Sequence, residues 1–206
     1  MPVSINCIDR HRSGSLLREN VCVEHEICQD TCSQNEIFPL ATIDEIDHLS
    51  EKIIAKARRV PEWTPYISRL AYLLTFTLHE TCMNAVEHGL LGINKETKQR
   101  MMEEMQERYL EEISRRWRIS GKKIQVSVCI NKRSVVVGVH DEGGGFDYRD
   151  EKYSPMNEQD VLAVSGRGLL ILKSLGVRLF WNKAGNTVLC SFRRDDLSNE
   201  PEMTVV

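Results

Sequence analysis

The chain has 206 residues, of which 41% are hydrophobic and 28% charged, an ordinary composition for a globular protein with a buried core. Its formal net charge of −3 argues against a nucleic-acid binder that acts through a broad basic surface. No apolar run approaches the roughly 18 residues needed to span a bilayer, and residues 1–20 lack the apolar stretch of a secretory signal. We therefore expect a cytoplasmic protein that contacts neither a membrane nor, directly, nucleic acid.

The first 41 residues are predicted to form an arm and a first strand, followed by one domain over residues 42–206. Residues 1–20 are polar and irregular, as in a loose arm. Residues 20–29 alternate between two unlike faces, which is typical of a strand.

The chain contains seven cysteines, an odd number, and the last three lie in apolar segments. This pattern favours buried, reduced thiols over a disulfide framework. One cluster has a spacing that could hold zinc and consists of Cys22, His25, Cys28 and Cys32. The strand-like alternation places His25 opposite Cys22 and Cys28, so a strand is the simpler interpretation and a zinc site the alternative.

Three helices are predicted next. The first, over residues 42–60, begins with the spacing of a capping box and carries an apolar stripe. Two prolines separate it from a second helix over about 65–88, and the glycines and asparagine of 89–94 end that helix.

The third helix, over residues 95–118, is highly charged but keeps an apolar stripe at helical spacing. The stripe consists of Met102, Met105, Tyr109, Ile113 and Trp117. Packing on the core is the simpler interpretation. A partner or dimer surface is the alternative, because methionine and aromatic side chains suit adaptable interfaces.

Beyond Gly121 the hydrophobic period changes from that of a helix to that of a strand. Residues 124–130 and 134–140 are predicted to form an antiparallel hairpin. A short apolar helix over 168–175 precedes a closing hairpin of 177–181 and 187–193.

The second helix carries the first candidate site residues. Glu80, Asn84 and His88 recur every four residues, so a helix places them on one face. A carboxylate in so apolar a helix is costly unless it has a partner or a task, such as that of a general base. An amide oxygen one turn away is a suitable ligand for magnesium. On the helix alone, a hydrogen-bonded polar stripe remains the simpler interpretation.

Two glycine-rich loops follow in the chain. Asp141 ends a predicted strand, and its carboxylate could accept a hydrogen bond from an amino group such as that of adenine. Gly143 and Gly145 would let a ring or a phosphate approach the backbone. Gly166, Arg167 and Gly168 precede a helix whose first amides could hold phosphate oxygens. Each signal is weak alone, but their order and setting together indicate a magnesium-nucleotide site.

On these motifs the chain resembles the GHKL (Bergerat-fold) superfamily of ATPases and kinases, and most of all the bacterial anti-sigma serine kinases. The resemblance covers roughly residues 42–193. The N box is matched by Glu80, Asn84, Ala85, His88 and Gly89. The G1 box is matched by Asp141, Gly143, Gly145 and Phe146. The G2 box is matched by Gly166, Gly168 and Leu169, and the last adenine-side motif by Gly185, Asn186 and Thr187.

The resemblance implies an α+β fold, a two-layer sandwich whose mixed, mostly antiparallel sheet carries helices on one face. ATP and Mg²⁺ would be bound, with Asn84 as the magnesium ligand and Glu80 as the base. Asp141 would read the adenine amino group and Thr187 would support the ring, while residues 148–165 would form a mobile lid. The glycines of both boxes, with Arg167 and Leu169, would complete the nucleotide site.

The resemblance also implies a serine/threonine kinase that phosphorylates an anti-anti-sigma (STAS-like) protein, sequesters a sigma factor and forms a homodimer. The connection over residues 91–121 is longer than in the compact kinases, and the first forty residues match no family feature. The alternatives are the catalytic domain of a histidine kinase, although His48 lacks that family's usual flanking residues, and a module that binds ATP without phosphotransfer.

Overall fold

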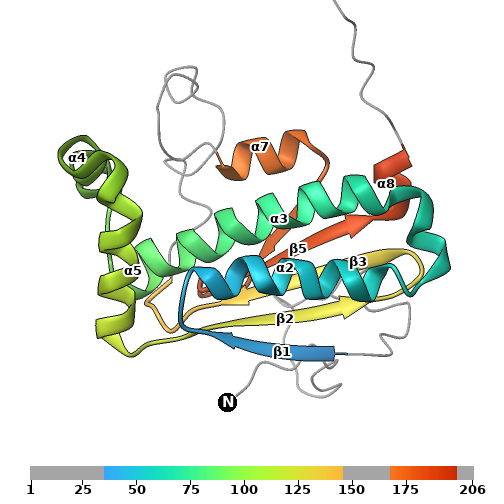
Figure 1. Ribbon diagram of the computed structural model, residues 1–206, viewed down its shortest axis with the longest axis horizontal. Coiled ribbons are helices and arrows are strands. Elements are labelled where there is room, and N and C mark those ends of the chain that lie inside the picture. The colour runs from blue at the N-terminus through green and yellow to red at the C-terminus, as the bar shows by residue number, and fades with distance from the viewer. Residues whose placement is uncertain (1–34, 146–167, 199–206) are drawn as a thin grey trace, which may run out of the picture.

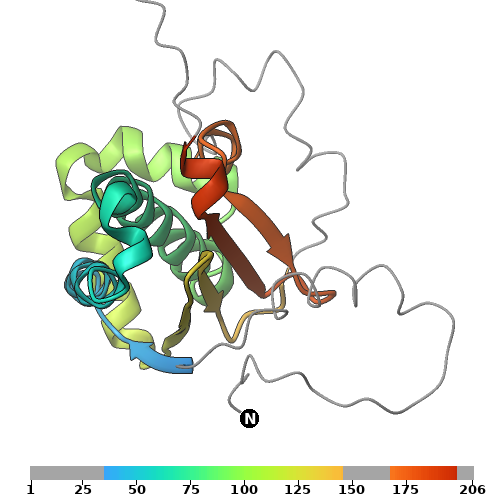
Figure 2. The same cartoon turned by 90° about the vertical axis from the view of Figure 1, so that its right-hand side faces the viewer.

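The computed structural model describes residues 35–145 and 168–198. They form two layers, a sheet of five strands and a set of helices on one of its faces (Figures 1 and 2). The strand order is β1-β2-β3-β5-β4, and neighbouring strands are antiparallel throughout the described part. The fold is therefore α+β, as expected, but the described sheet is wholly antiparallel instead of mixed. The strands are β1 (Asn35–Leu40), β2 (Ile124–Ile130), β3 (Ser134–His140), β4 (Arg178–Trp181) and β5 (Thr187–Arg193).

Each segment predicted as helix from the sequence pattern is helical, although the segment over residues 95–118 is divided into two helices. They are α2 (Asp44–Ala57), α3 (Ile67–Asn84), α4 (Lys95–Met105), α5 (Tyr109–Ser120), α7 (Gly168–Ser174) and α8 (Arg194–Ser198). The 3-10 turns η1 (Pro61–Tyr66) and η3 (Gln106–Arg108) precede α3 and α5, and the π-helix η2 (Ala85–Leu90) continues α3. None of the helices in the described residues is long and apolar enough to cross a bilayer.

β1 is a strand that the sequence pattern did not predict. It is short, carries Pro39 and lies at an edge of the described sheet, where a proline is tolerated because one side of the strand has no partner among the described strands. It pairs with β2 from Asn35 opposite Cys129 to Leu40 opposite Ile124. The strand predicted over residues 20–29 lies outside the described residues.

The predicted helix over residues 95–118 is instead two helices, α4 and α5. The helical conformation is interrupted at Gln106, which has φ 47° and ψ −116°. No glycine or proline stands at this point, so the sequence carries no stop signal there. Tyr109, Ile113 and Trp117 of the apolar stripe are buried in the core, which confirms the core-packing interpretation for α5.

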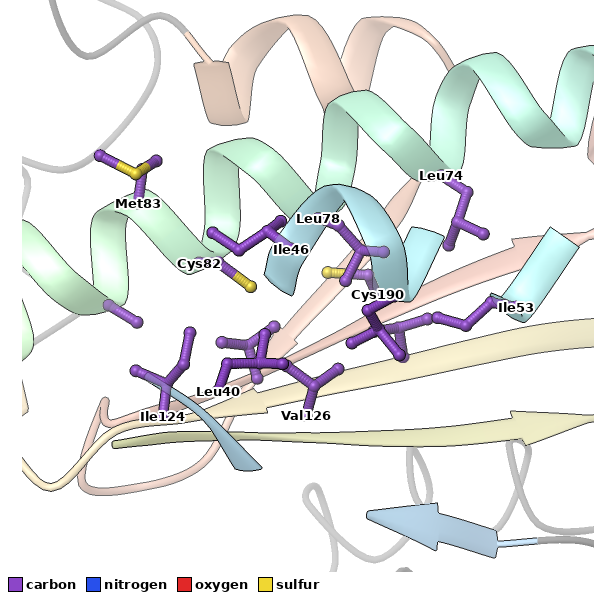
Figure 3. Close-up of a cluster of buried hydrophobic side chains, with 14 of the residues drawn as sticks. Leu40, Ile46, Ile53, Leu74, Leu78, Cys82, Met83, Ile124, Val126 and Cys190 are labelled. Carbon is purple, nitrogen blue, oxygen red and sulfur yellow. The ribbon is translucent and has the colours of Figure 1, made fainter. Parts of the chain in front are cut away.

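The core lies between α2, α3 and the inner face of the sheet (Figure 3). α3 contributes Leu74, Leu78 and Cys82, which are fully buried. Cys82 and Cys190 are free thiols, as expected, and burial raises the pKa of both, that of Cys190 to about 12. Cys129 is disulfide-bonded, so the expectation of reduced thiols does not hold for this residue.

Candidate functional site

Glu80 and Asn84 lie on α3, one helical turn apart and both half-buried. The helix forms because Leu74, Leu78 and Cys82, spaced four residues apart, bury one side of it against the core. Within the described residues, neither Glu80 nor Asn84 makes a side-chain hydrogen bond. A carboxylate and an amide oxygen are thus presented one turn apart without partners among the described residues, which suits the binding of a polar ligand.

The α-helical repeat ends at Asn84, since the next six residues form the π-helix η2. A π turn is wider than an α turn, and single turns of this kind occur often at functional sites. The His88 ring is bonded through Nδ1 to the carbonyl oxygen of Ile93, just past the helix end. His88 therefore has a structural role, fixing the end of this helix.

Asp141 follows β3 and is only 8% exposed. Its Oδ1 accepts a hydrogen bond from the Gly143 amide at 2.8 Å, and its own amide donates to the carbonyl of Asn186 at 3.0 Å. Burial raises the pKa of Asp141 above its usual range, against the smaller lowering by the Gly143 amide. The carboxylate thus retains acceptor capacity, because one oxygen is unused by these contacts.

Two glycines pack against Asp141 from different segments. At Gly89 on η2 a side-chain carbon would overlap the Asp141 carboxyl group. At Gly143 such a carbon would overlap the carbonyl oxygen of Gly89 and lie 2.7 Å from Asp141 Oδ1. The residues predicted for the N box and the G1 box therefore meet here, although about fifty residues separate them in the chain.

Gly145 extends this contact to the turn between β4 and β5. It has φ +73°, and a side chain there would overlap the carbonyl group of Ala184. Only glycine meets both conditions readily. Asn182 shapes the turn, because its Oδ1 accepts from the amides of Asn186 and Thr187 at 3.1 and 3.2 Å. The three segments thus form one cluster beside Asp141.

At the other end of the site, Gly168 begins α7 and packs against Glu80. A side-chain carbon at Gly168 would overlap the Glu80 carboxylate. The next residue, Leu169, is half-buried and packs against the core, which fixes α7 on α3. A helix rises about 1.5 Å per residue, so Glu80 and Gly89 are separated by roughly 13 Å along α3 and η2. The candidate site is therefore elongated, with Glu80 near one end and Asp141 near the other.

The Thr187 side chain points away from Asp141, although its amide belongs to the same turn. It lies opposite His140 in the β3–β5 register, and its hydroxyl is bonded to His140 Nδ1 at 2.9 Å and to Asn182 Nδ2 at 3.2 Å. Their neighbours Val139 and Val188 pack toward the core, so Thr187 and His140 occupy the other face of the sheet. The structure therefore separates Thr187 from Asp141, and its role in supporting adenine stays a prediction.

Several predicted residues lie outside the described part of the chain. These are Gly166, Arg167, Phe146, the lid over residues 148–165 and the possible zinc ligands Cys22, His25, Cys28 and Cys32.

Glu87 is a residue whose role the sequence reasoning missed. It is 1% exposed, accepts a hydrogen bond from the Tyr109 hydroxyl at 2.8 Å and pairs with Lys98 Nζ at 2.5 Å. Burial and the neighbouring carboxylate raise the pKa of Tyr109 above its usual range. The available signal was a carboxylate inside the apolar run of residues 85–90, followed by a helix with basic and aromatic residues.

No family model and no curated protein matches this chain. A family relationship is therefore a proposal that depends on the motifs and on the geometry of the site.

Proposed function

We propose that the chain binds Mg-ATP in a Bergerat-type site and transfers the γ-phosphoryl group to a serine or threonine hydroxyl of a protein partner. The observation that carries the proposal is the convergence of three separate motifs. Glu80, one turn before the carboxyl end of α3, contacts Gly168, and Gly89 on η2 contacts Asp141 and Gly143. Small residues at these contacts, with polar side chains between them, are typical of a nucleotide site.

The elongated arrangement suggests an orientation for the nucleotide. Asp141 presents a buried acceptor that suits the adenine amino group. Roughly 13 Å away, Glu80 and Asn84 suit the phosphate end. Asn84 fits Mg²⁺ because it offers a half-buried amide oxygen that no described residue occupies. When bound, Mg²⁺ would neutralise charge on the phosphates.

Glu80 then has a defined task. Its carboxylate would accept the proton of the attacking hydroxyl while that oxygen forms the new bond to the γ-phosphorus. The bond between the γ-phosphorus and the β-γ bridging oxygen breaks, and ADP leaves with the bonding electrons. The resemblance to anti-sigma kinases nominates an anti-anti-sigma (STAS-like) domain as the phosphate acceptor. It also nominates a sigma factor as a second partner and a homodimer as the assembly.

The test measures both binding and transfer. We expect the chain to bind ATP with Mg²⁺ and to move labelled γ-phosphate to a small anti-anti-sigma-like domain. Glu80→Ala should lower the transfer rate by about 100-fold or more, the usual contribution of a general base, while ATP affinity changes little. Glu112→Ala, which removes a partly buried carboxylate from α5, is the matched control and should leave transfer unchanged.

Three outcomes would count against parts of the proposal. If the wild-type chain fails to bind ATP, the nucleotide site is wrong. If the wild-type chain and Glu80→Ala both bind ATP but neither transfers phosphate, the chain is a binding module and not a kinase. If Glu80→Ala transfers phosphate at the wild-type rate, Glu80 is not the base.

A further inference from the structure

The segment over residues 91–121 packs against η2, which carries Gly89 at one end of the candidate site. In the structure, α4 and α5 stand at one end of the helical layer, beside the carboxyl end of α3 (Figure 1). Their contact with η2 includes buried charge. Lys98 of α4 and Tyr109 of α5 each bond one carboxylate oxygen of Glu87, at 2.5 and 2.8 Å.

Both oxygens of this carboxylate are therefore engaged, and by two different helices. The Glu87 side chain is 2% exposed and that of Lys98 is 20% exposed, so water has little access to the pair. A buried charge of this kind is costly without its partners, which gives the three side chains a strong preference for one mutual arrangement.

The backbone of the same turn is held as well. The carbonyl of Glu87 accepts from the Ile93 amide at 2.8 Å, and that of Leu90 accepts from Lys122 Nζ at 3.3 Å. Gly89 lies between these two anchors. Since Gly89 packs directly against the Asp141 carboxyl group, any displacement of η2 changes the space around Asp141.

We propose that Glu87, held by Lys98 and Tyr109, is a positioning residue that keeps η2 and Gly89 against Asp141 and so sets the recognition of the purine amino group. The inference rests on the proposed nucleotide site. It gives the segment over residues 91–121 a function within that site, since two of the three members of the cluster come from it.

The test compares Glu87→Gln with Glu112→Gln, which removes the charge of a partly buried carboxylate paired with Arg115 and Arg116 on its own helix. The probes are ADP and inosine diphosphate, which carries an oxygen in place of the amino group. The wild-type chain should prefer ADP. Glu87→Gln should weaken ADP binding about tenfold and inosine diphosphate binding less than twofold, because only ADP uses the Asp141 acceptor. Glu112→Gln should change neither affinity.

A second measurement needs no nucleotide. The Gly143 amide donates to Asp141 Oδ1, so its hydrogen exchange, followed by NMR, reports how firmly Asp141 is held. Exchange at Gly143 should become faster by about tenfold in Glu87→Gln and stay unchanged in Glu112→Gln. If Glu87→Gln does not fold, Tyr109→Phe removes one hydrogen bond without exposing the charge and should show the same effects at a smaller size.

The outcomes separate the two proposals. Equal loss of ADP and inosine diphosphate binding in a folded Glu87→Gln, or unchanged affinities, would reduce Glu87 to a structural residue and overturn the inference. If the wild-type chain binds neither nucleotide, the proposed function fails. In that case unchanged exchange at Gly143 would overturn the positioning role, and faster exchange would support it.

Discussion

At the scale of single residues, Asp141 is buried, yet its proposed role as a hydrogen-bond acceptor favours an ionised carboxylate. Its burial favours the protonated form and raises its pKa, whereas accepting a hydrogen bond from an amino group favours the ionised form. The folded state therefore holds the proton more tightly than the unfolded state, whose Asp pKa is about 3.9. The fold is favoured below that value and loses stability as the pH rises through the higher folded pKa.

We expect Asp141→Asn to raise the free energy of unfolding at pH 7, because the amide is neutral and keeps an oxygen for the Gly143 amide. The gain over wild type should shrink as the pH falls and vanish near pH 3, where both side chains are uncharged. Urea unfolding between pH 3 and 7 measures this difference. ATP binding by the variant should fall. A variant less stable than wild type at pH 7 would show that burial of the ionised Asp141 carboxylate does not destabilise the fold.

At the scale of elements, the break between α4 and α5 depends on one residue, Gln106. Its φ of 47° and ψ of −116° suit glycine, and a side chain there is strained. The change of chain direction at Gln106 places both Lys98 of α4 and Tyr109 of α5 beside Glu87. The strained conformation of Gln106 therefore allows the contact with η2.

Gln106→Gly should therefore stabilise the fold by about 0.5–1 kcal/mol, the relief of strain being partly offset by the greater freedom of glycine in the unfolded chain. The measurement is denaturant unfolding. Gln99→Gly, in the middle of α4, is the control and should destabilise by about 1 kcal/mol. Destabilisation by Gln106→Gly would mean that its side chain contributes more than its backbone strain costs.

At the scale of the whole molecule, α5 shares one core with the sheet and the other helices. Trp117 and Ile113 are buried in the same cluster as residues of α2, α3 and β2, and the Trp117 indole donates to the carbonyl of Lys122 at 3.1 Å. The segment over residues 91–121 is thus part of the domain and not a separate appendage.

Trp117→Ala should lower the free energy of unfolding by about 3–5 kcal/mol and leave a single transition. Circular dichroism and tyrosine fluorescence followed during the same titration should give coincident curves. A separate early transition, in which helix is lost before the sheet unfolds, would show that α4 and α5 fold independently of the core.

The elements with strong local signals could be predicted from the sequence, and those without them could not. Alternating apolar and polar residues predicted β2, and the capping box with its apolar stripe predicted α2. β1 was not predicted because its six residues include a proline. The break at Gln106 was not predicted because the strained backbone there depends on contacts with segments distant in the chain. In the site, Glu80, Asn84, Asp141 and the glycines were nominated by spacing, whereas Glu87 had no recognisable motif.

The sequence by itself determined most of the helices and strands, and the identity of the polar and glycine residues that could form a nucleotide site, because local periodicity and residue chemistry depend on the sequence alone. Only the tertiary structure decided which of these residues meet. Gly89 reaches Asp141 and Gly168 reaches Glu80, while alternation along β5 turns Thr187 to the other face. It also placed Glu87 between Lys98 and Tyr109, since a buried carboxylate takes its partners from whichever elements pack against it.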